Sequence, residues 1–495
     1  MTPRRSPASR RTKTMTFPWR CARAAVSLAL AGALALGIAA CSGGGAPGDA
    51  GWEVPACGPG DPALTALEYR VAPVGATASS SAPGSAATAV YDHDDAASYW
   101  SAGAASPQWI VLDLGSPRDV TQLRLCAMQR EGAVAARHRV YGSNGPDDAR
   151  LLAELVVQST HGQLLTATVP PGASAPVRYL RIETTTSEAS VVAWGKIDVW
   201  ARATHVPSWF GYYADAFSWL TPATAEVAGH VNLSWVGSGS DDLAMLLAGL
   251  QQARDSGLKV GLALPPDLFF TAGLDLVPQY LDAWNAVAAQ LVSYRDAIAF
   301  IYPIDEPYSQ AKVAGVPAAA MKSRLEAVGA AIKASFPEIP AAFSFSAIDF
   351  DTRDSAFADL VDPIPAHYDW FGFDCYGSWD QCGEPTYRAV HPIPWYVEQI
   401  KARLRGGQRI FLFPDAFVRQ AEPADAAADA AQAALRVSRA DKYLQLALSD
   451  AAVVGLFPFL YQDDYFEESR RFLGVRHWPA LQQRYREIGA VVSGK

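Results

Sequence analysis

Two patterns of hydrophobic and polar residues follow one another along the chain. Over residues 57–203, short segments alternate apolar and polar positions with a period of two, and turn residues separate them. This period is typical of strands with one buried face, and no long helical pattern intervenes. The clearest segments are 107–115, 120–128, 138–145, 178–186 and 195–201. We therefore predict an all-β jelly-roll sandwich over 57–203.

From about residue 209 the pattern changes to near-continuous apolar runs that alternate with amphipathic helical stretches. The runs cover 209–215, 230–236, 259–266, 298–307, 341–349, 368–377, 409–417 and 453–461. Fully apolar strands between helices indicate a parallel sheet buried on both faces. Eight such units predict an α/β fold of the closed (β/α)8 type, a TIM barrel, over 204–495. The alternative is a doubly wound open sheet, but the Gly-rich first turn typical of that fold is missing.

The first 40 residues read as a targeting segment. Basic residues without any acidic residue extend to Arg23, and the apolar run 24–40 follows, as in a secretory signal peptide. The sequence Ile38-Ala39-Ala40-Cys41 resembles the lipobox of bacterial lipoproteins. That resemblance implies lipidation of Cys41 and an exported protein anchored to a membrane, at the outer membrane or cell surface. A plain signal peptide with an incidental cysteine is the alternative, and 41–56 reads as a flexible tether.

Charge and motifs exclude several functions. The net charge is −9, and because the N-terminal segment is basic, the remainder is still more acidic. No basic surplus remains to neutralise phosphates, so nucleic acid is not an expected partner. The chain lacks a Gly-x-Ser-x-Gly elbow and a His-Glu-x-x-His motif. We expect no cofactor for catalysis.

Four cysteines remain after the signal peptide and Cys41 are set aside. An even number in an oxidising compartment favours disulfides over free buried thiols, although both remain open. Of the three pairings, Cys57 with Cys126 and Cys375 with Cys382 keeps each pair within one predicted domain.

The sandwich segment resembles the discoidin, or coagulation-factor C-type, domain, which includes family 32 carbohydrate-binding modules. The resemblance rests on the acidic loop 92–100, the strand 107–115, Tyr-Gly-Ser-Asn-Gly, Val-Arg-Tyr-Leu-Arg-Ile and the terminal Ile-Asp-Val-Trp. It implies carbohydrate binding and a structural Ca²⁺ with oxygen donors from Asp92, Asp95 and Asp198. The loop departs from the usual pattern at His93, and a solvated acidic turn is the alternative.

Candidate catalytic groups lie where the fourth apolar run ends. In a barrel the active site forms at the carboxyl ends of the strands, and this strand ends in Tyr302-Pro303-Ile304-Asp305-Glu306-Pro307. Alternation along the strand predicts that Glu306 shares the face of Tyr302 and that Asp305 takes the other face. Emergence from an apolar strand would raise the pKa of Glu306, as a general acid requires. A helix-capping Asp-Glu pair is the alternative.

This segment resembles clan A glycoside hydrolases, whose acid/base glutamate ends strand four, usually as Asn-Glu-Pro. The resemblance implies that Glu306 is the proton donor, with Asp305 in place of asparagine. Asp-Glu also resembles the pair of substrate-assisted N-acetylhexosaminidases, in which the aspartate orients the acetamido group. Clan A places a glutamate nucleophile on strand seven, where this chain has only Asp415. We predict Asp415 as nucleophile or base, with Asp374 on strand six as the fallback and a capping or binding role as the alternative.

Aromatic and polar residues at other strand ends predict a sugar-binding cleft, although packing is a competing role for each of them. Asp349 and the following residues are the candidates: Asp374, Tyr376, Trp379, Trp209, Tyr213, Asn232, Trp235, Tyr302 and Tyr461. The sequence thus predicts a glycoside hydrolase with an accessory sugar-binding domain and a carbohydrate substrate. A non-catalytic glycan-binding surface lipoprotein with a degenerate barrel, or a sandwich that binds protein or lipid headgroups, remains open.

Overall fold

The computed structural model describes residues 67–495 apart from 92–97, 130–131, 146–147, 173–174, 187–189, 218–222, 238–242, 384–389, 421–424 and 468–469. The predicted signal peptide, Cys41 with its predicted lipidation, the predicted tether, Cys57, Asp92 and Asp95 lie outside the described residues. Among the helices that the structure describes, none combines the length and apolarity needed to span a membrane.

The chain divides into two compact units. One contains Phe210–Ala440 and Leu456–Tyr485, and the other contains the described residues up to Trp209 together with Asp441–Gly455 and Arg486–Lys495.

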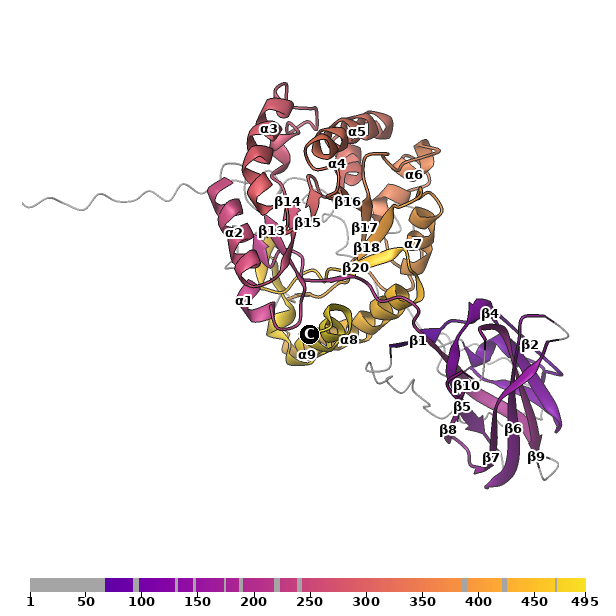
Figure 1. The fold of residues 1–495 in the computed structure, drawn as a ribbon. Coiled ribbons are helices and arrows are strands. Elements are labelled where there is room, and N and C mark those ends of the chain that lie inside the picture. Colours follow the sequence, from indigo (N-terminus) through magenta and orange to yellow (C-terminus); the bar gives the residue numbers. More distant parts are fainter. Residues whose placement is uncertain are drawn as a thin grey trace, which may run out of the picture. The chain divides into compact units, whose positions relative to one another are not determined.

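The first unit in chain order is built from two antiparallel sheets (Figure 1). One sheet has the order β1-β10-β5-β8, and β3 also pairs with β10. The other has the order β2-β4-β9-β6-β7. The strands are β1 (Glu68–Val71), β2 (Gly75–Ala78), β3 (Trp100–Ala105), β4 (Gln108–Arg118), β5 (Val120–Met128), β6 (Val134–Ser143), β7 (Arg150–Ser159), β8 (Leu164–Thr168), β9 (Val177–Thr186) and β10 (Val191–Arg202), with the short helix η3 (Ala87–Val90).

Alternation fixes which face of each strand is buried. In β4, Ile110, Leu112 and Leu114 are buried whereas the residues between them are part-exposed. On the paired strand β9, Leu180 and Ile182 are buried opposite them. The predicted β-sandwich is confirmed. The edge strand β7 and the short β8 escaped the sequence analysis because β7 exposes Leu151 and Val156, which blurs its alternation.

We assign every element from Trp209 onward to the second unit, in which strands and helices alternate along the chain. The strands are β11 (Trp209–Phe210), β12 (Ala216–Phe217), β13 (Leu233–Gly237), β14 (Lys259–Ala263), β15 (Ile298–Tyr302), β16 (Ala342–Ser346), β17 (Trp370–Asp374), β18 (Arg409–Phe413) and β20 (Val453–Leu456). The helices are α1 (Thr224–Val227), α2 (Leu243–Asp255), α3 (Tyr280–Leu291), α4 (Pro307–Val313), α5 (Ala318–Ser335), α6 (Ala356–Asp359), α7 (Ile393–Lys401), α8 (Ala426–Ser449) and α9 (Pro479–Ser493).

These strands form two sheets, with the orders β12-β13-β14-β15 and β11-β20-β18-β17-β16. Backbone contacts join the sheets at both ends. Between β15 and β16, Ile301 N donates to Pro340 O at 2.9 Å, and Ile301 and Ala341 form a parallel bridge. Between β11 and β13, Asn232 N donates to Phe210 O at 3.1 Å. Figure 1 shows the helices of this unit arranged around the outside of the strands.

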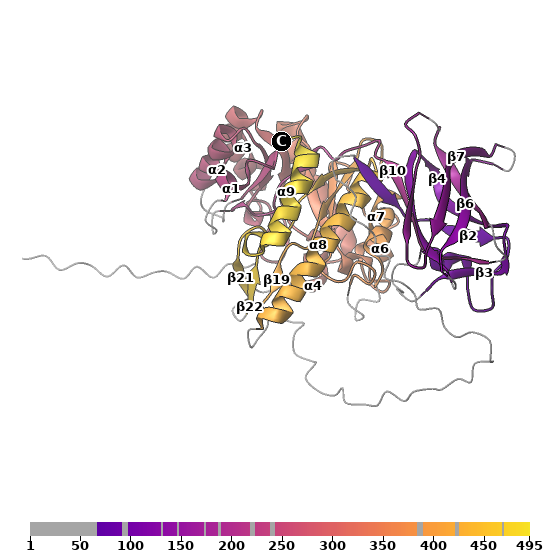
Figure 2. The same cartoon turned by 90° about the horizontal axis from the view of Figure 1, so that it is seen from below.

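A small antiparallel sheet sits beside α8. Strands β19 (Val418–Arg419), β22 (Arg470–Leu473) and β21 (Asp464–Glu467) pair in that order, and Figure 2 shows them near one end of α8. Val418 and Leu473 are buried against Ala433 of the helix. This sheet had no counterpart in the sequence analysis, since its strands are too short to show a period.

Aromatic rings fill the space that the parallel strands enclose. Trp235 lies 4.9 Å from Phe300, 5.1 Å from Tyr302 and 5.3 Å from Phe457, measured between ring centroids. Glycine makes room for these rings, because a Cβ on Gly261 would lie 2.5 Å from Cζ of Phe300. Large and small residues on adjacent strands thus interlock.

We expect Gly261→Ala to lower the free energy of unfolding of this unit by roughly 1–3 kcal/mol, because the added methyl group overpacks the interior. Urea unfolding followed by tryptophan fluorescence measures the change. Gly229→Ala is the matched control, since nothing lies within 4 Å of a Cβ there. Equal stabilities for the two variants would contradict the packing described.

Candidate active site

Acidic and hydroxyl side chains gather where the parallel strands of the second unit end. Tyr213 and Asp215 follow β11, Asp305 and Glu306 follow β15, Asp349 follows β16, Asp374 ends β17, and Asp415 follows β18. The carboxyl ends of parallel strands meet at one edge, so one rim carries these groups. Two non-glycine residues of this rim, Ala214 and Glu306, adopt positive φ values of 64° and 39°. Such backbone strain is concentrated at functional sites.

Asp305 is the centre of a hydrogen-bond network at this rim. Its Oδ1 accepts from the hydroxyls of Tyr302 and Ser344, the latter at 2.7 Å, and its Oδ2 accepts from Tyr213 at 3.5 Å. Burial raises the pKa of Tyr302 well above its usual value, and the nearby Asp305 carboxylate adds to this effect, so the phenol stays a donor. The network connects the segments that follow β11 and β15 with Ser344 of β16.

The predicted alternation fails at this point. β15 ends at Tyr302, and Pro303 to Glu306 leave the strand. Asp305, which we expected on the face opposite Tyr302, therefore turns back onto it. Side chains alternate between two faces only within a strand, and Asp305 lies beyond the end of β15.

Glu306 lies half-buried at the same rim in a left-handed conformation. Its backbone N–H donates to Ser344 Oγ at 3.2 Å, so one serine holds both acids. Glu306 occupies the position before α4, but its carboxylate makes no capping hydrogen bond to that helix. The helix-capping interpretation is thereby disfavoured.

Asp349 is a buried acid coupled to Glu306. It is 2% exposed, and its Oδ2 accepts from Ser346 N at 2.9 Å while its Oδ1 accepts from Ser309 Oγ at 3.2 Å. Burial, reinforced by the charge of Glu306, raises the pKa of Asp349 to about 8. Two acids at this corner of the rim therefore interact electrostatically, and Asp349 carries its proton at neutral pH.

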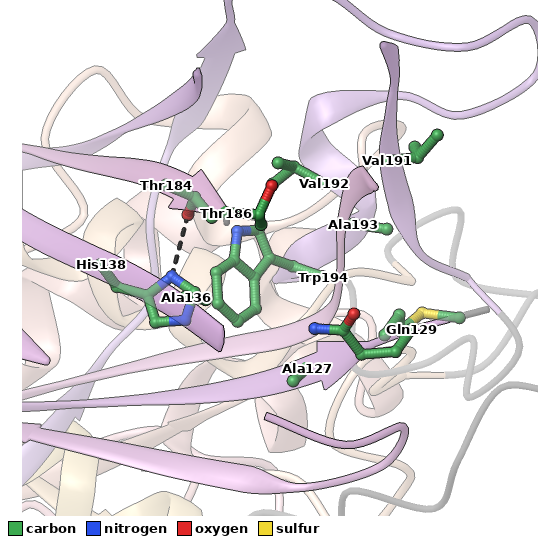
Figure 3. A pocket seen from close by; sticks show the side chains of 11 residues that line it. Ala127, Gln129, Ala136, His138, Thr184, Thr186, Val191, Val192, Ala193 and Trp194 are labelled. Carbon is green, nitrogen blue, oxygen red and sulfur yellow. Dashed lines mark hydrogen bonds between the residues drawn. The ribbon is translucent and has the colours of Figure 1, made fainter. Parts of the chain in front are cut away.

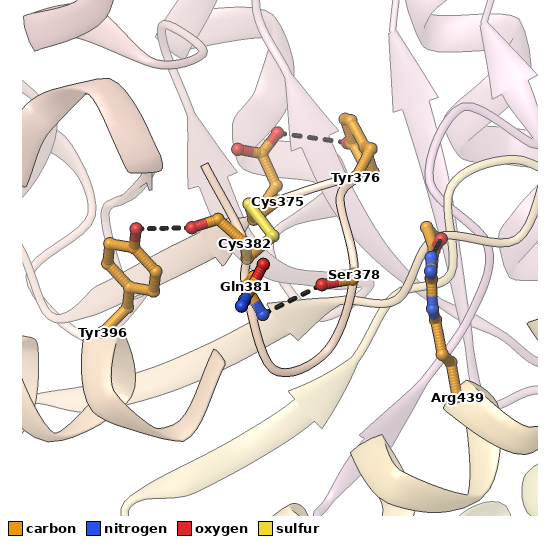
Figure 4. Close-up of a disulfide and its surroundings, with 9 residues drawn as sticks. Cys375, Tyr376, Ser378, Gln381, Cys382, Tyr396 and Arg439 are labelled. Atoms are coloured by element: carbon orange, nitrogen blue, oxygen red, sulfur yellow. Dashed lines mark hydrogen bonds and ion pairs between the residues drawn. A yellow bond between two sulfur atoms is a disulfide. The ribbon is translucent and has the colours of Figure 1, made fainter. Parts of the chain in front are cut away.

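Asp374 and the chain that follows it form a fixed segment of the rim. Tyr376 donates its hydroxyl to Asp374 Oδ2 at 3.1 Å, and a disulfide joins Cys375 to Cys382 (Figure 4). Backbone hydrogen bonds between Cys382 and His391 tie the segment to the chain before α7. The segment holds Tyr376 and Trp379 half-buried, with the Tyr376 ring stacked 5.4 Å from Phe459. The disulfide partner of Cys126 lies outside the described residues.

Asp415 does not face the rim as predicted. β18 ends at Phe413, and after Pro414 the Asp415 side chain is 1% exposed and paired with two arginines of α8. Its Oδ2 contacts Arg439 and lies 3.4 Å from Arg436 Nε. Burial raises its pKa to about 6, against the effect of these arginines. A carboxylate held this way is poorly placed to attack a sugar, so the arrangement favours a structural role for Asp415. Asp374 is then the better candidate for the second carboxylate.

Three of the residues expected to contact sugar are buried inside the protein, and a fourth, Asn232, is half-buried. Trp235 is 0% exposed among aromatic rings, and Tyr302 is engaged with Asp305. Buried Tyr461 donates to Glu226 at 3.2 Å, and Asn232 accepts from Phe210 N at 2.8 Å. Because these side chains contact other residues of the protein, we revise their predicted role from sugar binding to internal packing. Trp209, Tyr376 and Trp379 are half-buried, and Tyr213 keeps a small exposed fraction.

Asp215 is a rim acid that the sequence analysis missed. It is fully buried and accepts from Ser234 Oγ at 2.7 Å and Trp235 N at 2.6 Å. Burial raises its pKa to about 7. Its place directly after the first apolar run, two residues beyond Tyr213, was the available clue.

The sandwich has a small hollow of about 10 Å³, lined by residues of both sheets (Figure 3). His138 and Trp194 lie edge to face, 4.9 Å apart, and His138 Nδ1 is 3.1 Å from Thr184 Oγ1. Burial lowers the pKa of His138 to about 4, so the ring is neutral. Gln129 and Thr186 are part-exposed lining residues with polar side chains.

The described calcium donor is already paired. Asp198 is 4% exposed, and its Oδ1 lies 3.0 Å from Arg70 Nε. Asp92 and Asp95 lie outside the described residues. In the part of the chain that the structure describes, no group of three or more His, Cys, Asp or Glu side chains is arranged to hold a metal ion. Of the three expected donors, the structure thus describes one, and that one is held by Arg70.

Comparison with known proteins identifies the sandwich alone. Residues 75–198 match the F5/8 type C domain family. Similar solved structures include the family 32 carbohydrate-binding module of C. perfringens NanJ with galactose (16% identity, 27% of this chain, 99% of that chain, TM-score 0.24). A chitosan-binding module from Paenibacillus sp. IK-5 is another (22% identity, 26% of this chain, 98% of that chain, TM-score 0.22). No curated protein matches the chain.

The pKa of Asp349 predicts a pH-dependent stability. The folded state keeps a proton that the unfolded chain releases between about pH 4 and pH 8, so stability falls as pH rises through this window, by up to about 1.4 kcal/mol per pH unit. Asparagine retains an oxygen acceptor but has no proton to lose. We expect Asp349→Asn to flatten the decline between pH 5 and pH 7.5 in urea unfolding. Asp359→Asn, at an exposed site, is the control, and parallel curves for Asp349→Asn and wild type would refute the assignment.

Proposed function

We propose that the protein is an exported, surface-anchored glycoside hydrolase whose second unit is a (β/α)8 barrel and whose sandwich holds the glycan. The observation that carries the enzymatic part is the Asp305–Glu306 pair, fixed by Ser344 at the carboxyl end of β15. The lipid anchor on Cys41 remains a prediction from its lipobox-like sequence. A membrane partner follows from that anchor alone.

Several features support a barrel. Its strands pair in parallel wherever a register is described between neighbours, and backbone contacts link the two sheets at both ends. Aromatic rings fill the enclosed space as side-chain layers do in such barrels. The acids then lie on the face where barrel enzymes carry their active sites.

In the proposed reaction, Glu306 gives its proton to the glycosidic oxygen as the bond from that oxygen to the anomeric carbon breaks. Water adds to the anomeric carbon, and a second carboxylate accepts the proton that the water loses. Asp305 cannot easily serve as this base, because its Oδ1 already accepts two hydroxyl hydrogen bonds. Its Oδ2, which accepts from Tyr213 at 3.5 Å, would orient a substrate hydroxyl or amide.

Asp374 is our choice for the second carboxylate. Ser346 of β16 is in register with Asp374 of β17, and Ser344, two residues earlier, touches Asp305. Neighbouring strands are about 4.8 Å apart, so β15 and β17 lie about 10 Å apart across β16. Acids on strands this far apart favour the wider, inverting arrangement, in which a water molecule lies between the two carboxyl groups. Tyr376 keeps the Asp374 carboxylate in place by its hydrogen bond.

We expect Glu306→Gln to reduce hydrolysis of a natural glycan by about 10²–10⁴-fold, the range for loss of a general acid. The loss should be much smaller for dinitrophenyl glycosides, whose leaving group needs no proton. Asp374→Asn should lower turnover of both substrates. Initial rates on both substrate classes measure these effects.

Glu338→Gln is the matched control, because Glu338 is an exposed residue paired with Arg295. Unchanged turnover in Glu306→Gln would refute the site. Binding of glycans with no turnover on any substrate would instead indicate a non-catalytic glycan-binding protein.

For the sandwich, we propose glycan binding, with the part-exposed Gln129 beside the hollow as a contact residue, supported by the match to the F5/8 type C domain. Gln129 donates through Nε2 to Ser159 Oγ at 2.7 Å, which fixes its amide at this position. We expect Gln129→Ala to weaken retention of the full chain on insoluble polysaccharide several-fold while leaving hydrolysis of soluble aryl glycosides unchanged. Gln158→Ala, exposed on β7, is the control for pull-down measurements. Equal retention of both variants would exclude the hollow.

A further inference from the structure

A lysine lies in the sandwich where its ammonium bridges two separate stretches of chain. Lys196 of β10 is 7% exposed. Its Nζ donates to Ala89 O at 3.0 Å and to Ser98 Oγ at 2.5 Å. Ala89 belongs to η3, and Ser98 lies two residues before β3. One cation thus joins the two described ends of the acidic loop to the strand that carries Asp198.

The surroundings of Lys196 are unsuited to a divalent cation. The ammonium takes up a carbonyl and a hydroxyl oxygen, which are donors of the hard type that Ca²⁺ needs. The adjacent acid, Asp198, is paired with Arg70, and Lys196 and Arg124 also act on it electrostatically. A Ca²⁺ ion placed here would meet three positive side chains and would have to displace one of them from its partners.

We infer that Lys196 is a built-in cation that replaces a structural metal ion in this sandwich. Its ammonium holds η3 and the chain just before β3 against β10, and the domain keeps its fold without Ca²⁺. The inference does not depend on whether the second unit is an enzyme.

The first test uses the unmodified full chain. The melting temperature of the sandwich and the hydrogen exchange of peptides from η3 and β3 should be the same in EDTA and in millimolar CaCl₂. A rise in the melting temperature, or a slowing of exchange by tenfold or more on adding CaCl₂, would overturn the inference.

The second test removes the cation. In Lys196→Met, which keeps the length of the side chain, exchange in the peptides from η3 and β3 should accelerate at least tenfold, and CaCl₂ should not reverse the change. Arg202→Met removes a positive charge from the same strand at an exposed pair with Asp119 and should leave exchange within twofold of wild type. Equal exchange in the two variants would refute the tether.

If Lys196→Met does not fold, amine acetylation of wild-type protein decides the question. Lys196 is the sole lysine in residues 57–203, so mass spectrometry assigns modification of this domain without ambiguity. Its acetylation should be at least tenfold slower than that of exposed Lys401. Comparable rates for the two lysines would contradict the buried, bonded state on which the inference rests.

Discussion

The hydrogen bonds that converge on Asp305 are the constraint on which the candidate site depends. Parallel strands buried on both faces leave no place for an acid except where the strands end. There, Tyr302 and Ser344 both donate to one carboxylate oxygen of Asp305, while Ser344 also accepts from the backbone of Glu306. A buried serine on β16 therefore fixes the course of the chain after β15, and with it the left-handed turn that presents Glu306.

The acids of this rim differ because their surroundings differ. Asp349 and Asp215 are buried among hydroxyl and amide donors, and burial raises their pKa values to about 8 and about 7. Asp415 is buried too but is held by arginines of α8. Half-buried Glu306 is left beside a neutral acid, and Asp374 beside a phenol. The acids of one rim thus differ in the groups that surround and pair with them.

The sequence predicted the order of strands and helices well but the directions of side chains poorly. Apolar runs located β13 to β18 because both faces of those strands are buried, and alternation located β4. The prediction failed for Asp305 because the chain leaves the sheet after Tyr302, and alternation carries no information beyond a strand. Asp415 stays beside the sheet through a parallel bridge with Phe459, but its carboxylate is paired with two arginines of α8. Trp235 and Tyr461 looked like sugar platforms because composition alone does not separate a packed ring from an exposed one. Lys196 went unremarked, since its role depends on Ala89 and Ser98, which are distant in sequence.

The central claim is that this rim hydrolyses a glycosidic bond, and the most direct test is to follow the oxygen of water. The full chain would be incubated with a panel of extracellular polysaccharides in H₂¹⁸O, and the products analysed by mass spectrometry. Our account predicts new reducing ends that carry one ¹⁸O at the anomeric carbon. Unsaturated products without ¹⁸O, or intact glycan that is only bound, would contradict it.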